Sequence, residues 1–250
     1  MKTVSVLLKS ILVISTLVFA GCNDVTVSTG DGSEEVKASG VKMTEVREIP
    51  AFNQISLEGV FNVYLQQKDK ESVRIEADEN VLPLIVTEVV DGILTVKLKD
   101  DTKIVKMKLI NVYITLKDIQ KLETKGVGMV QCMEKLNLKT VELSLKGVGA
   151  TKLNLDCETL TIQSELVGSL GLQGSGKSLT IKHKGIGALE AFDFKAERVN
   201  LETDGVGKAE VFASEELIVD AKGLGGVEYK GNPSKKNIKK EGLGEVESAD

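Results

Sequence analysis

Apolar and polar residues alternate in short runs from about residue 43 to the end of the chain. Runs such as 60–65, 93–98 and 111–116 have the period of two that is typical of half-buried strands. No stretch longer than a turn has the spacing of an amphipathic helix. Residues 23–42 are polar and partly acidic, with almost no periodic apolar signal. The pattern therefore predicts an all-β domain that follows a polar segment.

A second period, of about 19 residues, is superimposed on this alternation. Seven triplets of the form Gly-x-Gly, one of which begins with Leu, recur at steps of 21, 19, 19, 20, 18 and 19 residues. Their middle residue is always Val, Ile or Leu. The triplets are Gly126-Val127-Gly128, Gly147-Val148-Gly149, Leu166-Val167-Gly168, Gly185-Ile186-Gly187, Gly205-Val206-Gly207, Gly223-Leu224-Gly225 and Gly242-Leu243-Gly244. The position four before each triplet is also apolar, held by Leu122, Leu143, Ile162, Ile181, Leu201, Val219 and Ile238.

These two periods together indicate stacked coils. Like residues would lie on one another at the inter-strand spacing of about 4.8 Å. No single coil buries its apolar side alone, so the interior becomes continuous only by stacking. We therefore predict a parallel, right-handed β-helix with about 19 residues per coil, regular over residues 119–250 within a single domain of residues 43–250. A β-propeller would need repeats of about 40 residues, and a leucine-rich repeat would show a ladder of asparagines.

The two ends of the domain are expected to differ from its middle. The N-terminal part is predicted to be a less regular β structure that covers the first coil, with Gly59-Val60 and Gly92-Ile93 as two weaker copies of the triplet. At the other end, charge in and around apolar positions is expected to blunt the open edge of the last coil. The residues concerned are Lys235, Lys236, Lys239 and Lys240.

Residues 1–21 have the form of a signal peptide that is removed on export. Lys2 and Lys9 supply a positive start, residues 4–19 are mainly apolar, and Ala20-Gly21 precede Cys22. Small residues directly before a cysteine mark a bacterial lipoprotein, so we predict lipidation of Cys22. An uncleaved membrane helix is disfavoured, because the apolar run is shorter than the roughly 20 residues that span a bilayer. Residues 22–42 would then be a flexible tether between the lipid and the domain.

The net charge argues against one class of partner. The chain carries 32 basic and 37 acidic residues, a net charge of -5. Removal of the signal peptide takes away two lysines and no acid, which makes the mature charge about -7. Nucleic-acid binding would require a concentrated basic face, so no nucleic-acid partner is predicted.

The opening of the domain and the triplet array resemble a known family. The similarity to the putative auto-transporter adhesin head GIN domain family rests on residues 47–65 (REIPAFNQISLEGVFNVYL), residues 72–80 (SVRIEADEN) and the Gly-x-Gly array, and it covers about residues 45–245. It implies a β-helical domain on exported proteins, often lipoproteins, of Gram-negative bacteria, and hence an outer-membrane location. It carries no catalytic residue to this chain. The six residues after Gly244 leave no room for the translocating β-barrel of an autotransporter.

The triplets are also the candidate binding surface. If their middle apolar residue points inward, the flanking glycines point outward and leave a stripe of bare backbone that an envelope glycan or protein could approach closely. The alternative is that glycine serves only the backbone, by allowing a positive φ at a corner of the coil. The predicted stripe consists of Gly126, Gly128, Gly147, Gly149, Gly185, Gly187, Gly205, Gly207, Gly223 and Gly225.

A column of charged residues stands one position before the triplets. It is interpreted as a solvated face that helps to set the register of the coils, and alternatively as a site for an anionic polymer. Its members are Lys125, Lys146, Glu165, Lys184, Asp204, Lys222 and Glu241.

Few residues are suited to catalysis or metal binding. His183 is the only histidine, so a histidine dyad or a zinc site would lack a second member. Cys132 and Cys157 fall on different walls of the coil and are predicted to be buried free thiols rather than a disulfide. No catalytic residue, metal site or cofactor is predicted.

The predicted function is that of a non-enzymatic, adhesin-like envelope lipoprotein, which is held at the membrane by its lipid and binds an envelope glycan or protein. The alternative is a carbohydrate-active β-helix enzyme, whose mark would be a concave groove with at least two carboxylates near a lysine or arginine. The absence of Trp and the aromatic content of 4% disfavour that alternative. A purely structural role is the third hypothesis.

Overall fold

The structure is a computed structural model that describes residues 24–30 and 34–250. Within these residues every regular element is a β-strand except one short 3-10 turn, η1 (Leu82–Leu84), so the protein is all-β as predicted. The predicted signal peptide, residues 1–21, and the predicted lipidation site, Cys22, lie outside the described residues.

The strands fall into an N-terminal and a C-terminal group. The first group comprises β1 (Val25–Ser28), β2 (Glu34–Lys37), β3 (Lys42–Arg47), β4 (Gln54–Gln67), β5 (Ser72–Asp78), β6 (Ile85–Val90), β7 (Ile93–Leu98), β8 (Thr102–Met107) and β9 (Ile110–Leu116). The second comprises β10 (Lys121–Cys132), β11 (Leu136–Asn137), β12 (Thr140–His183), β13 (Ile186–Thr203), β14 (Ala209–Ala221), β15 (Val227–Lys230), β16 (Lys235–Lys240) and β17 (Val246–Ser248).

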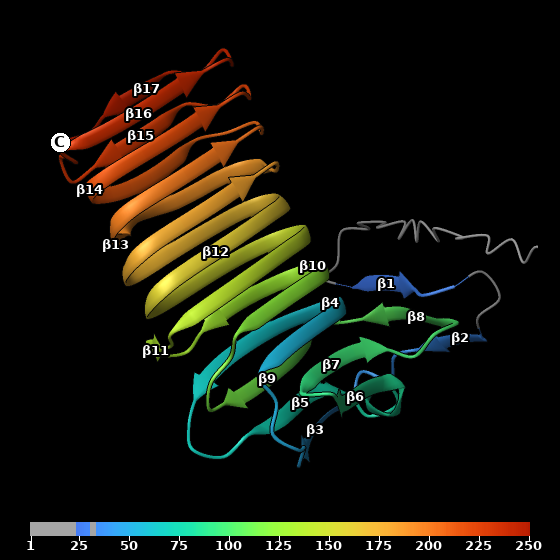
Figure 1. The fold of residues 1–250 in the computed structure, drawn as a ribbon. Coiled ribbons are helices and arrows are strands. Elements are labelled where there is room, and N and C mark those ends of the chain that lie inside the picture. The colour runs from blue at the N-terminus through green and yellow to red at the C-terminus, as the bar shows by residue number, and fades with distance from the viewer. Residues whose placement is uncertain (1–23, 31–33) are drawn as a thin grey trace, which may run out of the picture.

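One large sheet contains most of these strands. Its main path runs β17-β15-β14-β13-β12-β10-β4-β9-β5-β3, and from β9 to β17 every pairing is parallel. Residues one repeat apart face each other, so Gly126 pairs with Gly59 on one side and with Gly147 on the other. Figure 1 shows β10 to β17 as successive layers that end at the C-terminus. The predicted stacking of triplet on triplet is confirmed.

The core of this stack is built from equivalent aliphatic side chains of successive layers. Position four before the triplet is buried in six layers, at Leu122, Leu143, Ile162, Ile181, Leu201 and Val219. In the last layer the equivalent Ile238 is 40% exposed, and the whole of β16 is exposed, including its lysines. The apolar interior is therefore continuous along the layers and opens to solvent only at the C-terminal end.

The N-terminal end is less regular, and one predicted repeat there is wrong. β7 aligns with the first half of β4 and β9 aligns with the second half, so two separate strands form this layer. Gly92 does not align with Gly59. Asp91 and Gly92 form instead a two-residue hairpin turn between β6 and β7, with φ values of 50° and 76°. An Asp-Gly pair between alternating runs is a strong hairpin signal, and here it outweighs the likeness to the triplet.

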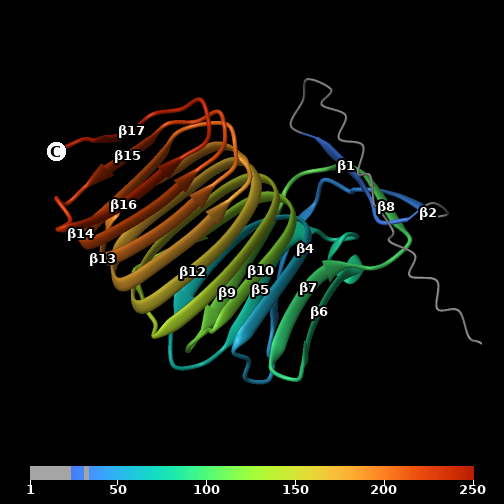
Figure 2. The same ribbon diagram turned by 45° about the horizontal axis from the view of Figure 1, so that its top comes forward.

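Part of the predicted tether is also ordered. β1 and β2 lie within residues 22–42 and pair with the two sides of β8 in a separate three-stranded sheet. Figures 1 and 2 both show this sheet beside the N-terminal end of the stack. Each of the two strands has only four residues, and Val27 in β1 is buried and pairs with Ile104 in β8. Such short runs give no detectable period by themselves.

Candidate functional site

In six of the seven triplets the middle residue points away from the core, contrary to the prediction, whereas Val127 of the first triplet is partly buried and packs against the core. Val148, Val167 and Ile186 expose 49%, 47% and 55% of their surface. Leu166, which replaces the first glycine of the third triplet, is by contrast buried. We call the exposed row the apolar ladder; it consists of Val148, Val167, Ile186, Val206, Leu224 and Leu243.

The parity of the alternation explains this orientation. In the layer that contains Gly185, the buried residues His183 and Leu189 stand two positions before and four positions after that glycine. Even positions counted from the first glycine thus face inward, so the middle residue, at an odd position, faces outward. The prediction followed the apolar character of the middle residue instead of its parity, and it was wrong for that reason.

The flanking glycines are required by the close stacking of the layers. Gly149 has a φ of 142°, and a Cβ atom at this position would overlap the carbonyl oxygen of Gly128 in the preceding layer. The backbone groups of the triplets are used between layers, because Gly187 N–H donates to Val206 O at 2.8 Å and Val206 N–H donates to Gly185 O at 3.1 Å. All ten glycines of the predicted stripe lie against the backbone of the preceding layer in this way. The glycines therefore serve the stacking of the layers, and their role as a binding stripe stays a prediction.

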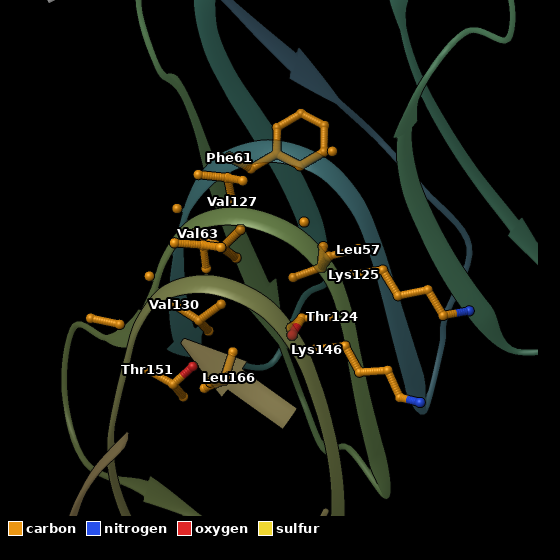
Figure 3. A pocket seen from close by; sticks show the side chains of 16 residues that line it. Leu57, Phe61, Val63, Thr124, Lys125, Val127, Val130, Lys146, Thr151 and Leu166 are labelled. Carbon is orange, nitrogen blue, oxygen red and sulfur yellow. The ribbon is translucent and has the colours of Figure 1, made fainter. Parts of the chain in front are cut away.

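The space beneath the N-terminal triplets is too small for a ligand. A cavity of about 40 Å³ lies there, lined by inward side chains that include Leu57, Val63 and Leu166. Figure 3 shows these side chains around the cavity, with Lys125 and Lys146 directed away from it. The volume has room for no more than a few water molecules.

The outer side of the triplets offers a broader surface. A hollow of about 290 Å³ is lined by three equivalent residues from each of three layers, namely Lys184, Gly185, Ile186, Asp204, Gly205, Val206, Lys222, Gly223 and Leu224. The structure thus brings together the apolar ladder, the flanking glycines and the charged column, and we call this surface the Gly-x-Gly face. Charges of the column form ion pairs, between Lys146 and Glu165 at 3.2 Å and between Lys222 and Asp220 at 2.8 Å. The first of these links neighbouring layers, as expected for a face that sets register.

A larger concavity lies on another wall, five to eight residues after the triplets. It has a volume of about 590 Å³, and we call it the polar groove. It is lined by Gln131, Cys132, Met133, Glu134, Lys152, Leu153, Asn154, Gly171, Leu172, Gln173, Glu190, Phe192, Asp193, Glu210 and Lys230. Sequence analysis missed this groove because its polar residues differ from layer to layer and form no repeat.

The polar groove contains carboxylates near lysines, the arrangement that would mark a carbohydrate-active enzyme. Glu190 and Glu210 are direct neighbours in register on adjacent strands. Glu210 is engaged by Lys208 at 2.8 Å, and Lys208 also contacts Glu228 at 2.8 Å. The hydrogen bonds that the Lys208 ammonium donates to these two carboxylates raise the pKa of Lys208 to about 12.

The histidine and the cysteines are not placed for catalysis. His183 is buried, its Nδ1 lies 3.2 Å from Ser164 Oγ, and its Nε2 has no partner. Burial lowers the pKa of His183, which favours the neutral ring. Cys132 and Cys157 are both free thiols, half-buried rather than fully buried. Burial raises the pKa of both, to about 11 for Cys157, so the unreactive thiol form predominates at neutral pH.

Two kinds of feature are absent from the described part of the chain. Among residues 24–30 and 34–250, no three His, Cys, Asp or Glu side chains are grouped in a way that could hold a metal ion. Within the same residues, no helix has the length and apolar character needed to cross a bilayer.

Known proteins resemble this chain in sequence and in structure. The family model described as putative auto-transporter adhesin, head GIN domain, matches residues 51–233. A solved structure described as a putative adhesin from Bacteroides fragilis NCTC 9343 is 29% identical, with a TM-score of 0.82 over 85% of this chain and 99% of that chain. No curated protein matches the chain.

Two structures of lower identity share the fold. One, described as a putative lipid binding protein from Parabacteroides distasonis ATCC 8503, is 19% identical with a TM-score of 0.63, and covers 87% of this chain and 100% of that chain. The other, described as a putative adhesin from Parabacteroides merdae ATCC 43184, is 21% identical with a TM-score of 0.61 over the same shares of the two chains.

Proposed function

Because the chain belongs to the putative auto-transporter adhesin head GIN domain family, we propose that it is an adhesin-like binding module of the bacterial cell envelope. In this proposal the Gly-x-Gly face contacts a partner in the envelope, either a glycan or another protein. The protein acts by binding and not by catalysis.

The observation that carries this proposal is the apolar ladder. Six aliphatic side chains in six consecutive layers point into solvent. Monomeric soluble proteins scatter their exposed apolar residues, whereas a contiguous row marks an interaction surface. The paired charges of the column border this row, as the polar rim borders the apolar centre of a protein interface.

We also propose that the domain is a parallel, right-handed β-helix with about 19 residues per coil. The parallel pairing from β9 to β17, with residues one repeat apart opposite each other, supports this architecture. The burial of equivalent residues in successive layers supports it as well. A solenoid of this kind presents a long, regular face, which suits adhesion to an extended partner.

The anchoring of the module is a further part of the proposal. Export by the signal peptide of residues 1–21 and lipidation of Cys22 would hold the domain at the outer membrane. Along the chain, β1 and β2 then lie between the lipid and the stack. Replacement Cys22→Ala tests this part: the variant should leave the membrane fraction and lose incorporation of a labelled fatty acid, and retention of the label would contradict the proposal.

The binding proposal is tested with the full mature chain and isolated envelope fractions. The double variant Ile186→Asp and Val206→Asp places two charges in the apolar ladder, at side chains that are already exposed. We expect the capture of envelope material to fall roughly tenfold or more. A charged side chain in an apolar contact loses its hydration without gaining a partner, which costs binding free energy. The control Asn200→Asp, at an exposed residue on another wall, should bind as the wild type does. Undiminished capture by a correctly folded double variant would contradict the proposal.

A second candidate function is favoured by the polar groove. Its size falls within the range of small-molecule sites, and Glu190 and Glu210 line it as direct neighbours on adjacent strands. A carbohydrate-active enzyme would need one carboxyl group to act as an acid and another to act as a base or nucleophile. Release of new reducing ends from an envelope polysaccharide by the purified protein would favour this candidate over the binding module.

A further inference from the structure

We propose that the polar groove is a second binding site, which holds a stretch of neutral oligosaccharide without cleaving it. The groove shares no residue with the hollow on the Gly-x-Gly face. The inference therefore goes beyond the function proposed for that face, and each of the two can fail without the other.

The first observation is that most polar side chains of the groove have no partner within the protein. Among the described residues, these side chains take part in no hydrogen bond or ion pair: Gln131, Glu134, Lys152, Asn154, Gln173, Glu190 and Asp193. Glu210, by contrast, pairs with Lys208, and Lys230 lies over the Phe192 ring. Amides offer donors and acceptors and carboxylates offer acceptors, the set of groups that the hydroxyls of a sugar require.

The second observation is a glycine that the backbone does not need. Gly171 does not have a positive φ, and a Cβ atom there would meet only Lys152 Cγ at 3.8 Å and Thr151 O at 4.0 Å, which are ordinary contacts. This sets it apart from the glycines of the triplets. It stands in register with Glu190 on the next strand, so the missing side chain leaves a gap between Lys152 and Glu190. The gap gives a ligand access to the groove at its middle.

The apolar part of the groove suits the faces of sugar rings. The half-buried Phe192 contributes an aromatic ring to the groove, and Leu153 and Leu172 lie buried in the core beneath it. The Phe192 ring has the Lys230 ammonium at 4.4 Å from its centre. Sugar rings combine apolar C–H faces with polar edges, so a site for them needs an apolar surface beside hydrogen-bonding groups.

The charges of the groove select for a neutral ligand. Four carboxylates, on Glu134, Glu190, Asp193 and Glu210, line the groove with two ammonium groups, on Lys152 and Lys230, and Lys208 pairs with Glu210 from outside the lining. An anionic glycan would be repelled by this excess of negative charge, whereas a neutral one would not. The lining residues come from successive layers at the spacing of about 4.8 Å, so the groove is elongated across the strands and fits an extended chain rather than a single sugar.

The test uses the full mature chain in detergent, with cellotetraose and N-acetylated chitotetraose as neutral probes and tetragalacturonate as the anionic probe. Binding is measured by saturation-transfer NMR and calorimetry. We expect at least one neutral probe to bind in preference to the anionic one. The variant Gly171→Gln, which fills the gap, should weaken that binding roughly tenfold or more. The matched control Gly226→Gln lies outside the groove and has similar room, because its Cβ would meet only Glu245 O at 3.5 Å. It should bind within about twofold of the wild type.

Several results would overturn the inference. They are failure of both neutral probes to bind, tighter binding of tetragalacturonate, equal loss of binding in the two glycine variants, and cleavage of a bound probe. Urea unfolding of each variant shows whether it is folded. If Gly171→Gln is not folded, the variant Asp193→Ala, at an exposed side chain, replaces it. We expect its affinity for the neutral probe to fall at least roughly threefold. An unchanged affinity would count against the inference. Ile186→Asp should leave oligosaccharide binding unchanged, which separates this site from the Gly-x-Gly face.

Discussion

At the scale of the residue, glycine has two distinct roles in this chain. In the triplets it permits the close approach of successive layers, as at Gly149, where a side chain would overlap the backbone of Gly128. At Gly171 it leaves open space above an ordinary extended backbone. The first role is a condition for folding, whereas the second shapes a surface.

The two roles predict opposite effects of adding a single methyl group. Gly149→Ala should lower the free energy of unfolding by roughly 1–3 kcal/mol or more, because alanine is strained at a φ of 142° and its Cβ collides with the preceding layer. Gly171→Ala should be neutral or should stabilise by up to about 1 kcal/mol. Urea unfolding measures both, and equal destabilisation by the two substitutions would contradict this account of the triplets.

The buried histidine makes stability depend on pH. The pKa of His183 is lowered by burial, so the unfolded chain takes up a proton at this residue more readily than the folded protein does. The contribution of His183 to the free energy of unfolding is fully present above the ordinary histidine pKa of about 6.5. It falls as the pH drops from there toward the pKa of His183 in the folded protein.

The variant His183→Leu tests this dependence, because leucine occupies the equivalent position in Leu145. Unfolding free energies at pH 7.5 and pH 5 should differ less in the variant than in the wild type, by up to about 1.4 kcal/mol for each pH unit of the shift. The carboxylates contribute equally to both proteins and cancel in this comparison. An identical pH dependence in wild type and variant would show that His183 is not perturbed by burial.

At the scale of the element, the alternation along each strand decides which side chains build the core. Leu189 lies at an even position from its triplet and is buried, whereas Ile186 lies at an odd position and is exposed. The two residues are similar in size and only three positions apart. Their contributions to stability should nevertheless differ widely.

Truncation of each side chain measures this difference. Leu189→Ala should cost about 2–5 kcal/mol, because it leaves a cavity in a packed interior. Ile186→Ala should change stability by no more than about 0.5 kcal/mol. The reverse order of the two effects would mean that the middle residue of the triplet faces inward after all.

The elements also show how far the sequence alone leads. Burial at Leu122 and its equivalents follows directly from period and repeat, because every layer contributes the same residue type to the same position. The polar groove could not be predicted, because Lys152 and Glu190 are far apart in the sequence. They line the same open space only once the layers are stacked on either side of Gly171. The hairpin at Asp91-Gly92 was predictable from its turn residues. The strands within residues 22–42 were not, because four residues are too few to display a period.

At the scale of the whole molecule, the stack is a one-dimensional array with two unlike faces. The Gly-x-Gly face is apolar at its centre and repeats in every layer, whereas the polar groove is specific to a few layers. A repeated face suits an extended or polymeric partner, and a local groove suits a defined ligand. Anchoring through Cys22 would place both at the envelope.

The central claim is that the Gly-x-Gly face contacts a partner in the cell, and in-cell photo-crosslinking at position 186 tests it most directly. A photoreactive residue replaces Ile186 in the full chain, and the same residue at Asn200, exposed on another wall, serves as the control. We predict a discrete adduct, reproducible between cultures, from position 186 and none from position 200. The absence of any adduct from position 186, or the same adducts from both positions, would contradict the claim.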